Sequence, residues 1–495
     1  MMMLTYIKKI KIGRFGFITN YFNLKSIKQR LYLKNIVTIE DIKPSRSKSG
    51  FYGKMPDKSN TINDDVSEKL IKSKENNNKK ECTLCSFNLN AWFTIINLVT
   101  GALGGGVIAF PSILRDIGMV TGMICFFIVA FSVYYSLDLL RRFVVDTKLF
   151  SYASITNATL GYFWLIMYSI SSFIVYMMSI ASYLHILFLI SFSVIGISDD
   201  KEDKSVEKLI YFFISYIIEV LLCLFTSNLS KIHILSTICF CIFVIILLAV
   251  IIGGFINITK GNLDYATAFE IKRYNNSWEK FICIMSKINE FLVGFLSHST
   301  FPTLLNLYQS PNDDEKTKKI NKVQLIILYI LYGLYTIFGL FYLGNSNDND
   351  KNNNNKYKTK DLKTGDYIVN ILLMVYIISL VPIRYLIIRD NYTSVLKKDY
   401  LPAKIEIPIT CLCILICNIF ASLIRNNRIN DVFMNIFIAI FGVFICFILP
   451  VINFVKLNDK TKIRSIIGYI ISGIFILIGI FSIIFYIIDW KKNNK

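Results

Sequence analysis

The sequence predicts an all-α integral membrane protein with about eleven transmembrane helices, and both its composition and the spacing of its charges support this fold class. Of its 495 residues, 54% are hydrophobic and 18% are charged, and the mean hydropathy is +0.51. A helix needs about 20 mostly apolar residues to cross about 30 Å of hydrocarbon. Several stretches without Asp, Glu, Lys or Arg are long enough for at least one crossing: 83–114, 149–198, 232–259, 323–347 and 465–488. A soluble protein has no need of so many.

Hydrophobic runs between polar segments predict where each helix crosses. The predicted spans are 91–114, 117–140, 163–193, 208–227, 232–257, 281–309, 322–344, 367–389, 407–424, 432–455 and 464–488. The third run is longer than one crossing needs, so its helix must tilt or project. All four tryptophans lie at predicted span ends, where indole rings favour the membrane interface.

The charge of the loops predicts the orientation, because Lys and Arg favour the cytosolic side of a membrane. Loops 141–162 and 456–464 are basic and belong inside, whereas loop 196–208 is acidic and belongs outside. We expect residues 1–90, which are basic, to form a cytosolic N-terminal tail beside anionic lipid. No recognisable module accompanies this charge, so we expect no nucleic acid partner. The plasma membrane and an acidic vacuolar or lysosome-like membrane both remain open.

Five regions follow from this division of the chain. They are the basic and largely disordered tail 1–90, a first five-helix repeat 91–257, an external loop 258–280, a second five-helix repeat 281–455, and 456–495 with the eleventh span and the C-terminus. Within the second repeat we expect a disordered insertion at 345–364, because its Asn-rich start cannot bury enough apolar surface to become ordered.

The first span has a glycine cluster at its centre. Gly101, Gly104, Gly105 and Gly106 fall within six residues, and each Gly weakens a helix by up to about 1 kcal/mol relative to Ala. Unwound backbone is tolerated at membrane depth only where it lines a cavity or is buried in protein. We expect a break, after which the N–H groups of a second half-helix face an anion such as a substrate carboxylate. The alternative is close helix packing through small residues.

A similar pattern occurs in the sixth span. Phe110-Pro111 in the first span has a counterpart in Phe301-Pro302, and each pair follows a glycine in mid-span, Gly106 and Gly294 respectively. Interruptions at corresponding places indicate an inverted repeat, with the substrate bound between its two halves.

Ionisable residues inside the spans are costly unless they face a partner or water. Glu290 in span 6 either carries a coupling proton or pairs with Lys287 one turn earlier. Glu219, near the middle of span 4, has no partner nearby in the sequence, so it needs a cationic neighbour, a proton or water. His298, beside Ser297 in span 6, either lines a polar cavity or packs as a satisfied histidine.

The segment Asn97 to Gly106, which reads NLVTGALGGG and is followed by Ala109-Phe110-Pro111 and then by Gly118, Gly122 and Tyr135, resembles the opening signature of the amino acid/auxin permease family. Further matches are Phe295-Leu296-Ser297-His298 with Pro302, Val381-Pro382-Ile383-Arg384 and Phe447-Ile448-Leu449-Pro450. The resemblance covers about 91–488 by order and spacing.

The resemblance implies a LeuT-like 5+5 inverted repeat plus one extra helix, and transport of amino acids driven by protons or sodium. With the glycine break it gives a candidate substrate site of Asn97, Thr100, Gly101, Gly104, Gly105, Gly106, Gly294, Ser297 and His298. Glu290 and Glu219 are the candidates for proton coupling. A sodium site would want hydroxyls on span 8, whose middle offers mainly Ser379, so we favour a proton or facilitated diffusion over sodium.

The expected function is therefore transport of amino acids by alternating access, without a cofactor. The alternatives are a carrier of other small amines or organic acids on the same fold, and an amino acid sensor that signals through the tail. We expect no enzyme, since no nucleophile and base set rises above chance. A single CxxC at Cys82 and Cys85 is weak evidence for zinc, so we expect no metal site. The amino acid, the direction of flux and the oligomeric state stay open.

Overall fold

The structure is a computed structural model that describes residues 89–195, 205–226, 229–260, 276–308, 313–343, 364–398, 401–426, 435–457 and 462–493. The chain divides into two units, Met1–Lys80 and Glu81–Lys495, and all the described residues belong to the second. Within these residues every regular element is a helix. This confirms the predicted all-α class.

The helices of the first half of the chain are α4 (Leu89–Ala102), η2 (Gly105–Ala109), α5 (Phe110–Ile117), α6 (Met119–Thr147), α7 (Tyr152–Leu160), α8 (Tyr162–Ile195), α9 (Ser205–Phe225) and α10 (Leu229–Thr259). Those of the second half are α11 (Ser277–Gly294), α12 (Phe301–Leu305), α13 (Asp314–Leu343), α14 (Thr364–Val395), α15 (Ala403–Asn426), η5 (Ile438–Gly442), η6 (Phe444–Ile448), α17 (Leu449–Leu457) and α18 (Lys462–Asn493).

Every predicted span coincides with one or more of these helices, but the number eleven is not confirmed. In the described part of the chain, eight helices are long and apolar enough to cross a membrane, or nine if a bent pair counts as one span. The fourth predicted span is α9, whose apolar part, Ile210–Phe225, is shorter. The sixth span, 281–309, is divided between α11 and α12, and it is not among the nine.

The first span is broken where the glycine cluster predicted it. α4 ends at Ala102, and the next helix turns by 59° from it. Gly104 between them has an extended backbone (φ −103°, ψ 167°), and a five-residue 3-10 helix, η2, leads into α5. The second half of the span therefore starts as a 3-10 turn, and its regular α-helix begins at Phe110.

The sixth span is broken at the corresponding place. α11 ends at Gly294, and residues 295–300 form turns before α12 begins. Phe110-Pro111 opens α5 and Phe301-Pro302 opens α12, with the proline in the first two positions of each helix. Proline suits this position because it lacks the N–H that a helix start leaves unpaired. The two Phe-Pro pairs thus mark equivalent helix starts.

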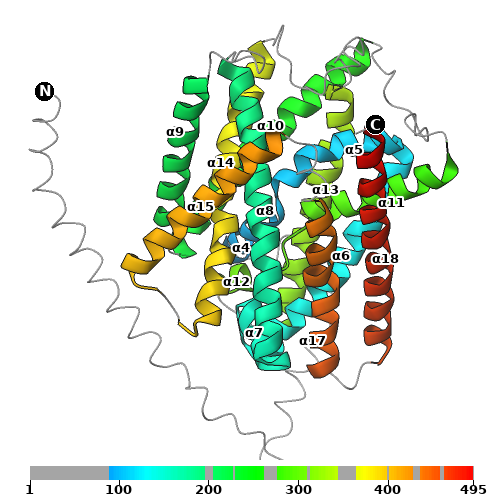
Figure 1. The fold of residues 1–495 in the computed structure, drawn as a ribbon. Coiled ribbons are helices and arrows are strands. Elements are labelled where there is room, and N and C mark those ends of the chain that lie inside the picture. The colour runs from blue at the N-terminus through cyan, green and yellow to red at the C-terminus, as the bar shows by residue number, and fades with distance from the viewer. Residues whose placement is uncertain are drawn as a thin grey trace, which may run out of the picture. The chain divides into compact units, whose positions relative to one another are not determined.

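The helices pack in two groups (Figure 1). In the first group α13 packs against α4, α5 and α6, α11 packs against α6, and α12 packs against α4. In the second group α8 packs against α14 and α15, and α9 packs against the same two helices. Helices one, two, six and seven of the predicted repeats therefore lie together, as do helices three, four, eight and nine. α10 contacts both groups through α4, α13 and α14. This is the arrangement that two inverted repeats produce.

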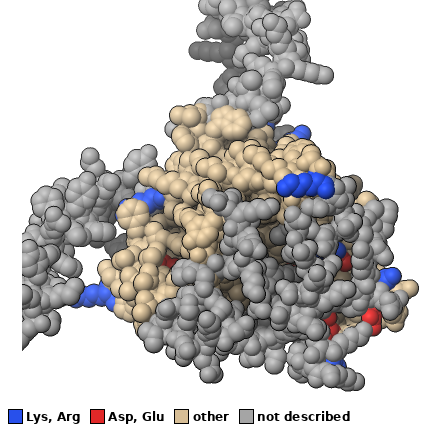
Figure 2. Space-filling model, turned by 90° about the horizontal axis from the view of Figure 1, so that it is seen from above, with Lys and Arg blue, Asp and Glu red and all other residues tan. Residues whose placement is uncertain are grey.

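The surface of the helices is apolar, as a lipid-facing surface must be. Phe131 on α6, Ile252 on α10 and Leu477 on α18 are 65%, 60% and 56% exposed. A soluble protein rarely exposes large apolar side chains on so many helices. Figure 2, which views the molecule from above toward the helix ends, shows a few Lys, Arg, Asp and Glu residues among the described residues of that face.

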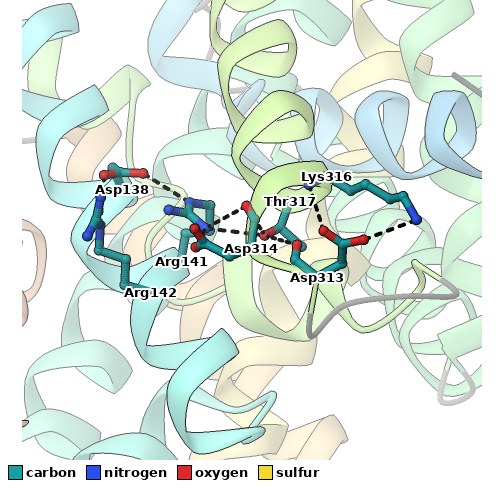
Figure 3. Close-up of polar contacts among 7 residues, drawn as sticks. All are labelled: Asp138, Arg141, Arg142, Asp313, Asp314, Lys316 and Thr317. Atoms are coloured by element: carbon teal, nitrogen blue, oxygen red, sulfur yellow. Dashed lines mark hydrogen bonds and ion pairs between the residues drawn. The ribbon is translucent and has the colours of Figure 1, made fainter. Parts of the chain in front are cut away.

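An ion-pair network joins α6 to the start of α13 (Figure 3). The fully buried Arg141 pairs with Asp138 on its own helix (2.9 Å) and with Asp314 on α13 (2.5 Å). Its Nη1 also donates to Thr317 Oγ1 (3.2 Å). The backbone N–H of Lys316 donates to Asp313 Oδ1 (3.1 Å), and this bond lowers the pKa of the Asp313 carboxyl. The network fastens two helices within the first group.

The tenth predicted span contains two π-helical segments, η5 and η6, before α17. A π-helix has a wider turn than an α-helix and often marks a special site. Hydroxyl groups from neighbouring helices donate to carbonyls of this stretch. Tyr152 donates to Ile445 (3.1 Å) and Ser472 to Phe447 (3.0 Å). These bonds fix η6 against α7 and α18.

Some predictions fall on residues that the structure does not describe. These are the tail with Cys82 and Cys85, the acidic part of loop 196–208 up to 204, most of loop 258–280 and nearly all of the insertion 345–364.

Candidate functional site

The two broken spans meet at their glycines. A Cβ atom added to Gly106 would lie 3.0 Å from both the Cα and the N of Gly294, and a Cβ added to Gly294 would lie 2.2 Å from the ring of Phe110. Backbone atoms cannot move aside as a flexible side chain can, so position 106 needs glycine. The Phe110 ring is packed against Phe126, Phe291 and Tyr332 and has little room to move, so position 294 also favours glycine. The two breaks lie against each other.

One tyrosine side chain, on α13, and one arginine side chain, on α14, connect the two breaks. The Tyr332 hydroxyl of α13 lies 2.8 Å from Ala102 O at the end of α4 and 2.8 Å from Gly294 O at the end of α11. Arg384 of α14 donates from Nη1 to Leu296 O (2.6 Å), in the break of the sixth span. A Cβ on Gly104 would lie 2.6 Å from Arg384 Nη2, so the guanidinium also touches the break of the first span.

Backbone N–H groups are left without backbone partners at the first break. Leu103 N–H still donates to Val99 O of α4 (2.7 Å). The next backbone hydrogen bond along the chain runs from Val107 N–H to Gly104 O (3.2 Å). Among the described residues, the N–H groups of Gly104 and Gly106 make no bond to a backbone carbonyl. Buried N–H groups are rarely left unpaired in proteins. The N–H of Gly104 donates to the Tyr332 hydroxyl. The N–H of Gly106, together with the Arg384 guanidinium, makes the break a place that favours an anion.

Several polar side chains of the second break are buried without partners. His298 is fully buried, and neither of its ring nitrogens has a hydrogen bond within the described part of the chain. The hydroxyls of Ser299 and Tyr176 are also buried and lie near each other, without a hydrogen bond of good geometry to any described group. Tyr176 lies under Arg384, whose guanidinium carbon is 5.7 Å from the ring centre. Unpaired buried polar atoms are costly, so a ligand or water that paired them would stabilise the site.

Asn97 and Thr100, which the sequence assigned to the site, point to α10. Asn97 Nδ2 donates to Phe93 O (2.7 Å) and lies 3.0 Å from His233 Nδ1. Thr100 Oγ1 bonds to the carbonyls of Ile96 (2.9 Å) and Ser236 (3.1 Å). These two side chains fasten α4 to α10. The structure brings together Gly104, Gly106, Gly294 and the residues after it, with Gly105 at the start of η2.

Gly101 lies between these two sets. A Cβ there would meet Leu304 Cδ1 at 2.6 Å and Thr300 Oγ1 at 3.4 Å, so Gly101 allows α4 to approach α12. Ser297 Oγ is buried and bonds weakly to Phe295 O (3.4 Å) in its own turn. Ser379 Oγ donates to Val375 O of its own helix (2.8 Å).

Glu290 lies in an ion-pair cluster on α11, one helical turn before the break. Lys287 Nζ is 2.9 and 3.0 Å from its two carboxylate oxygens and 3.1 Å from Asp116 Oδ2 on α5. The Tyr486 hydroxyl of α18 donates to Glu290 Oε1 (3.0 Å). The sequence left open whether Glu290 carries a coupling proton or pairs with Lys287, and the structure shows the pair with Lys287.

Glu219 is fully buried between α9 and α15. Ser215 Oγ donates to one carboxylate oxygen (2.5 Å) and Asn418 Nδ2 to the other (2.9 Å). The expectation that Glu219 has no partner nearby in the sequence is therefore wrong, because Ser215 lies one helical turn before it. No Lys or Arg of the described segments forms an ion pair with Glu219.

The residues that sequence reasoning missed are Arg384, Tyr183 and Tyr332. Arg384 Nε donates to the Tyr183 hydroxyl of α8 (3.2 Å), and Tyr183 also lies against Gly104. Arg384 stands inside the predicted span 367–389 and was noted only as part of a family match. A charged residue inside an apolar span was the available signal. Tyr183 and Tyr332 gave no such signal in the sequence, because a tyrosine inside an apolar span looks like any other membrane-embedded residue.

Solved structures with a similar fold are membrane transporters. A Na+-coupled sialic acid symporter in a substrate-bound outward-open state matches with a TM-score of 0.52 and 14% identity, covering 80% of this chain and 88% of the symporter. The manganese transporter of Eremococcus coleocola matches with a TM-score of 0.54 and 11% identity, covering 82% and 89%. At such identities the likeness shows the fold alone, and it supports the predicted LeuT-like class.

The remaining comparisons concern sequence. A search of curated proteins finds no match. The family described as transmembrane amino acid transporter protein matches residues 88–489. This range runs from the start of α4 almost to the end of α18, so it includes both broken spans. The family and the fold are those of membrane transporters and not of enzymes. The chain therefore belongs to the transmembrane amino acid transporter protein family.

Proposed function

We propose that this protein carries amino acids across a membrane by alternating access, with the substrate bound between the two broken spans. The observation that carries the proposal is the contact of the two breaks at Gly106 and Gly294. Unwound backbone inside a membrane protein offers N–H and C=O groups that a continuous helix would use internally. An amino acid zwitterion carries the two charges that such groups bind.

The carboxylate binds at the N–H of Gly106, next to Gly104 and the Arg384 guanidinium. The ammonium group binds toward the carbonyl ends of α4 and α11, which carry the partial negative charge of a helix C-terminus. His298 and Ser299, with their unpaired polar atoms, contribute to the pocket around the substrate. Asn97 and Thr100 do not contact the substrate; they hold α4 against α10 and so position the break of the first span.

The movement is a displacement of one helix group against the other. α4, α5, α6, α11, α12 and α13 pack together and would move as a body relative to α8, α9, α14 and α15. The Arg141 network supports such a body, because it ties α6 to α13 within the moving group. The substrate site lies between the two groups, where Arg384 and Tyr183 of the second group face Gly104 of the first.

Proton coupling or facilitated diffusion fits this site better than sodium coupling. Ser379, the candidate sodium ligand of span 8, uses its hydroxyl on its own helix. Arg384 already brings a positive charge to the breaks, and a second cation beside it would be repelled.

The test is uptake of labelled amino acids into proteoliposomes under imposed pH and sodium gradients. We expect saturable uptake by the wild type and by Gly333→Leu, because Gly333 on α13 has nothing within 4 Å of an added Cβ. We expect Gly106→Leu to lose at least about tenfold in uptake, which corresponds to only about 1.4 kcal/mol. Circular dichroism and size-exclusion profiles check that both variants are folded.

Three outcomes would contradict the proposal. Equal uptake by Gly106→Leu and the wild type would remove the breaks as the site. Saturable uptake of amines or organic acids in preference to amino acids would favour the carrier of other substrates. Binding of amino acids without flux, together with loss of a signalling phenotype when residues 1–80 are deleted, would favour a sensor.

A further inference from the structure

Arg384 is a buried cation without a carboxylate partner in the described part of the chain. The residue is 2% exposed, and α14 carries it into the interior of the molecule. Arginine keeps its charge in proteins, so burial cannot be relieved by loss of a proton. The other fully buried arginine, Arg141, has two carboxylates against it. Arg384 has a phenol, a carbonyl and an aromatic ring instead.

The donors of Arg384 are only partly used. A guanidinium has five N–H donors in a planar fork. The described contacts use Nε for the Tyr183 hydroxyl and one N–H of Nη1 for Leu296 O. Three of the five remain: the second N–H of Nη1 and both of Nη2. These lie at the end of the fork, and Nη2 is the nitrogen that touches Gly104.

The end of the fork therefore meets the break of the first span, where the N–H of Gly106 makes no bond to a backbone carbonyl of the described residues. The Tyr183 hydroxyl also lies against Gly104, and the guanidinium is the group there that carries a full positive charge. An oxygen pair that can accept from both nitrogens of a guanidinium is the geometry of a carboxylate.

We propose that Arg384 binds the substrate carboxylate and makes it a requirement for recognition, so that the protein selects amino acids and rejects amines that lack a carboxylate. This inference rests on the proposed function and adds the residue that sets the substrate class. The physical reason is that an amine or a carboxamide would leave the buried guanidinium uncompensated, and a site built around a buried charge rejects a ligand that cannot pair it.

The test compares each amino acid with its own carboxamide, which keeps the side chain and the ammonium group and loses only the anion. The probes are the labelled proteinogenic amino acid that the wild type binds best in nanodiscs, and the matching unlabelled carboxamide as competitor. We expect the wild type to prefer the acid by at least about thirtyfold, equivalent to about 2 kcal/mol. Arg384→Gln should reduce this preference to within about threefold, and Arg384→Lys should retain part of it because the charge remains.

Arg141→Gln is the matched control, because Arg141 is also a fully buried arginine but lies in the α6 and α13 network. It should lower stability and leave the preference for the acid unchanged. If Arg384→Gln weakens binding of acid and carboxamide equally, the residue only positions Leu296 and Tyr183, and the proposal is wrong. The proposal is also wrong if Arg384→Gln keeps the wild-type preference for the acid over the carboxamide, whether or not its uptake becomes sodium-dependent.

Different results would refute the proposed function and the role of Arg384. If the wild type binds no amino acid, the proposed function falls and this assignment falls with it. If the wild type binds and carries amino acids while Arg384→Gln keeps the full preference for the acid, the function stands and only the role of Arg384 is refuted. If the Gln variant does not fold, Arg384→Lys provides the comparison, because lysine keeps the charge and lacks the guanidinium. A preference for the acid in this variant equal to the roughly thirtyfold preference of the wild type would then refute the role of the guanidinium.

Discussion

Glu219 and Glu290 both lie inside helices, and they differ in the charge that surrounds them. Glu290 shares Lys287 with Asp116 and accepts a hydrogen bond from Tyr486. Glu219 is fully buried and receives hydrogen bonds only from the neutral groups of Ser215 and Asn418. A buried carboxylate without a cation is the better candidate for taking up a proton during a transport cycle, because neutralisation removes the cost of its burial.

Replacing each of the two carboxylates by Gln separates these roles. We expect Glu219→Gln to abolish the pH dependence of uptake while leaving exchange of substrate intact, because the amide cannot carry a proton in and out. Glu290→Gln should keep the pH dependence and lower the midpoint of thermal unfolding, since Lys287 and Tyr486 lose their partner. Initial rates between pH 5 and 8 measure the first effect, and thermal unfolding in detergent measures the second. Loss of pH dependence in Glu290→Gln alone would reverse the assignment.

At the scale of helices, the Arg141 network and the two breaks have opposite mechanical effects. The network joins the end of α6 to the start of α13 and makes these helices move together (Figure 3). The breaks interrupt the first and sixth spans in the same helix group. The group is therefore stiff near one end of α13 and deformable at the substrate site.

The network gives a direct prediction about stability. Arg141 is fully buried, whereas the side chain of its neighbour Arg142 is 25% exposed. The carboxylates of Asp138 and Asp314 are 21% and 60% exposed, so they remain solvated when Arg141 is removed, and the loss is that of hydrogen bonds to charged groups. We therefore expect Arg141→Gln to lower the free energy of unfolding by about 2 kcal/mol, and Arg142→Gln by under about 1 kcal/mol. Equal effects in denaturant titrations would show that the network does not stabilise the helix group.

The sequence predicted the helices well and the site only in part, for reasons that differ by residue. Apolar runs must match the thickness of a bilayer, and glycine clusters and Phe-Pro pairs act locally, so the breaks near Gly104 and Gly294 were predictable. The bonds of Arg384 depend on how α14 packs against a segment 88 residues away in the chain. The partner of Glu219 on α15 is 199 residues away. Such contacts follow from the tertiary fold and leave no local pattern.

At the scale of the molecule, the exposed apolar side chains make the bilayer part of the folded state. Leu477 lies at the middle of α18 and is 56% exposed, and Ile463 lies at its start and is 75% exposed. The two positions have similar chemistry and different depth. They therefore separate burial in lipid from simple exposure.

We expect Leu477→Lys to impair membrane insertion and Ile463→Lys to be tolerated. A lysine at the centre of a span costs about 2.5 to 3.5 kcal/mol in insertion, whereas one near the end can reach the interface. The fraction of α18 inserted, measured with glycosylation sites placed on either side of it, tests this. Equal insertion of both variants would mean that α18 does not cross the membrane at the predicted depth.

Tyr332 has one hydroxyl proton and two carbonyl oxygens at 2.8 Å, one from each broken span. It can donate that proton to only one of them at any moment. If the end of α4 or of α11 shifts, the hydroxyl can turn and donate to the carbonyl that stays within reach. A single phenol thereby keeps its donor paired through small displacements of either helix end, and a phenylalanine at this position would leave both carbonyls without it.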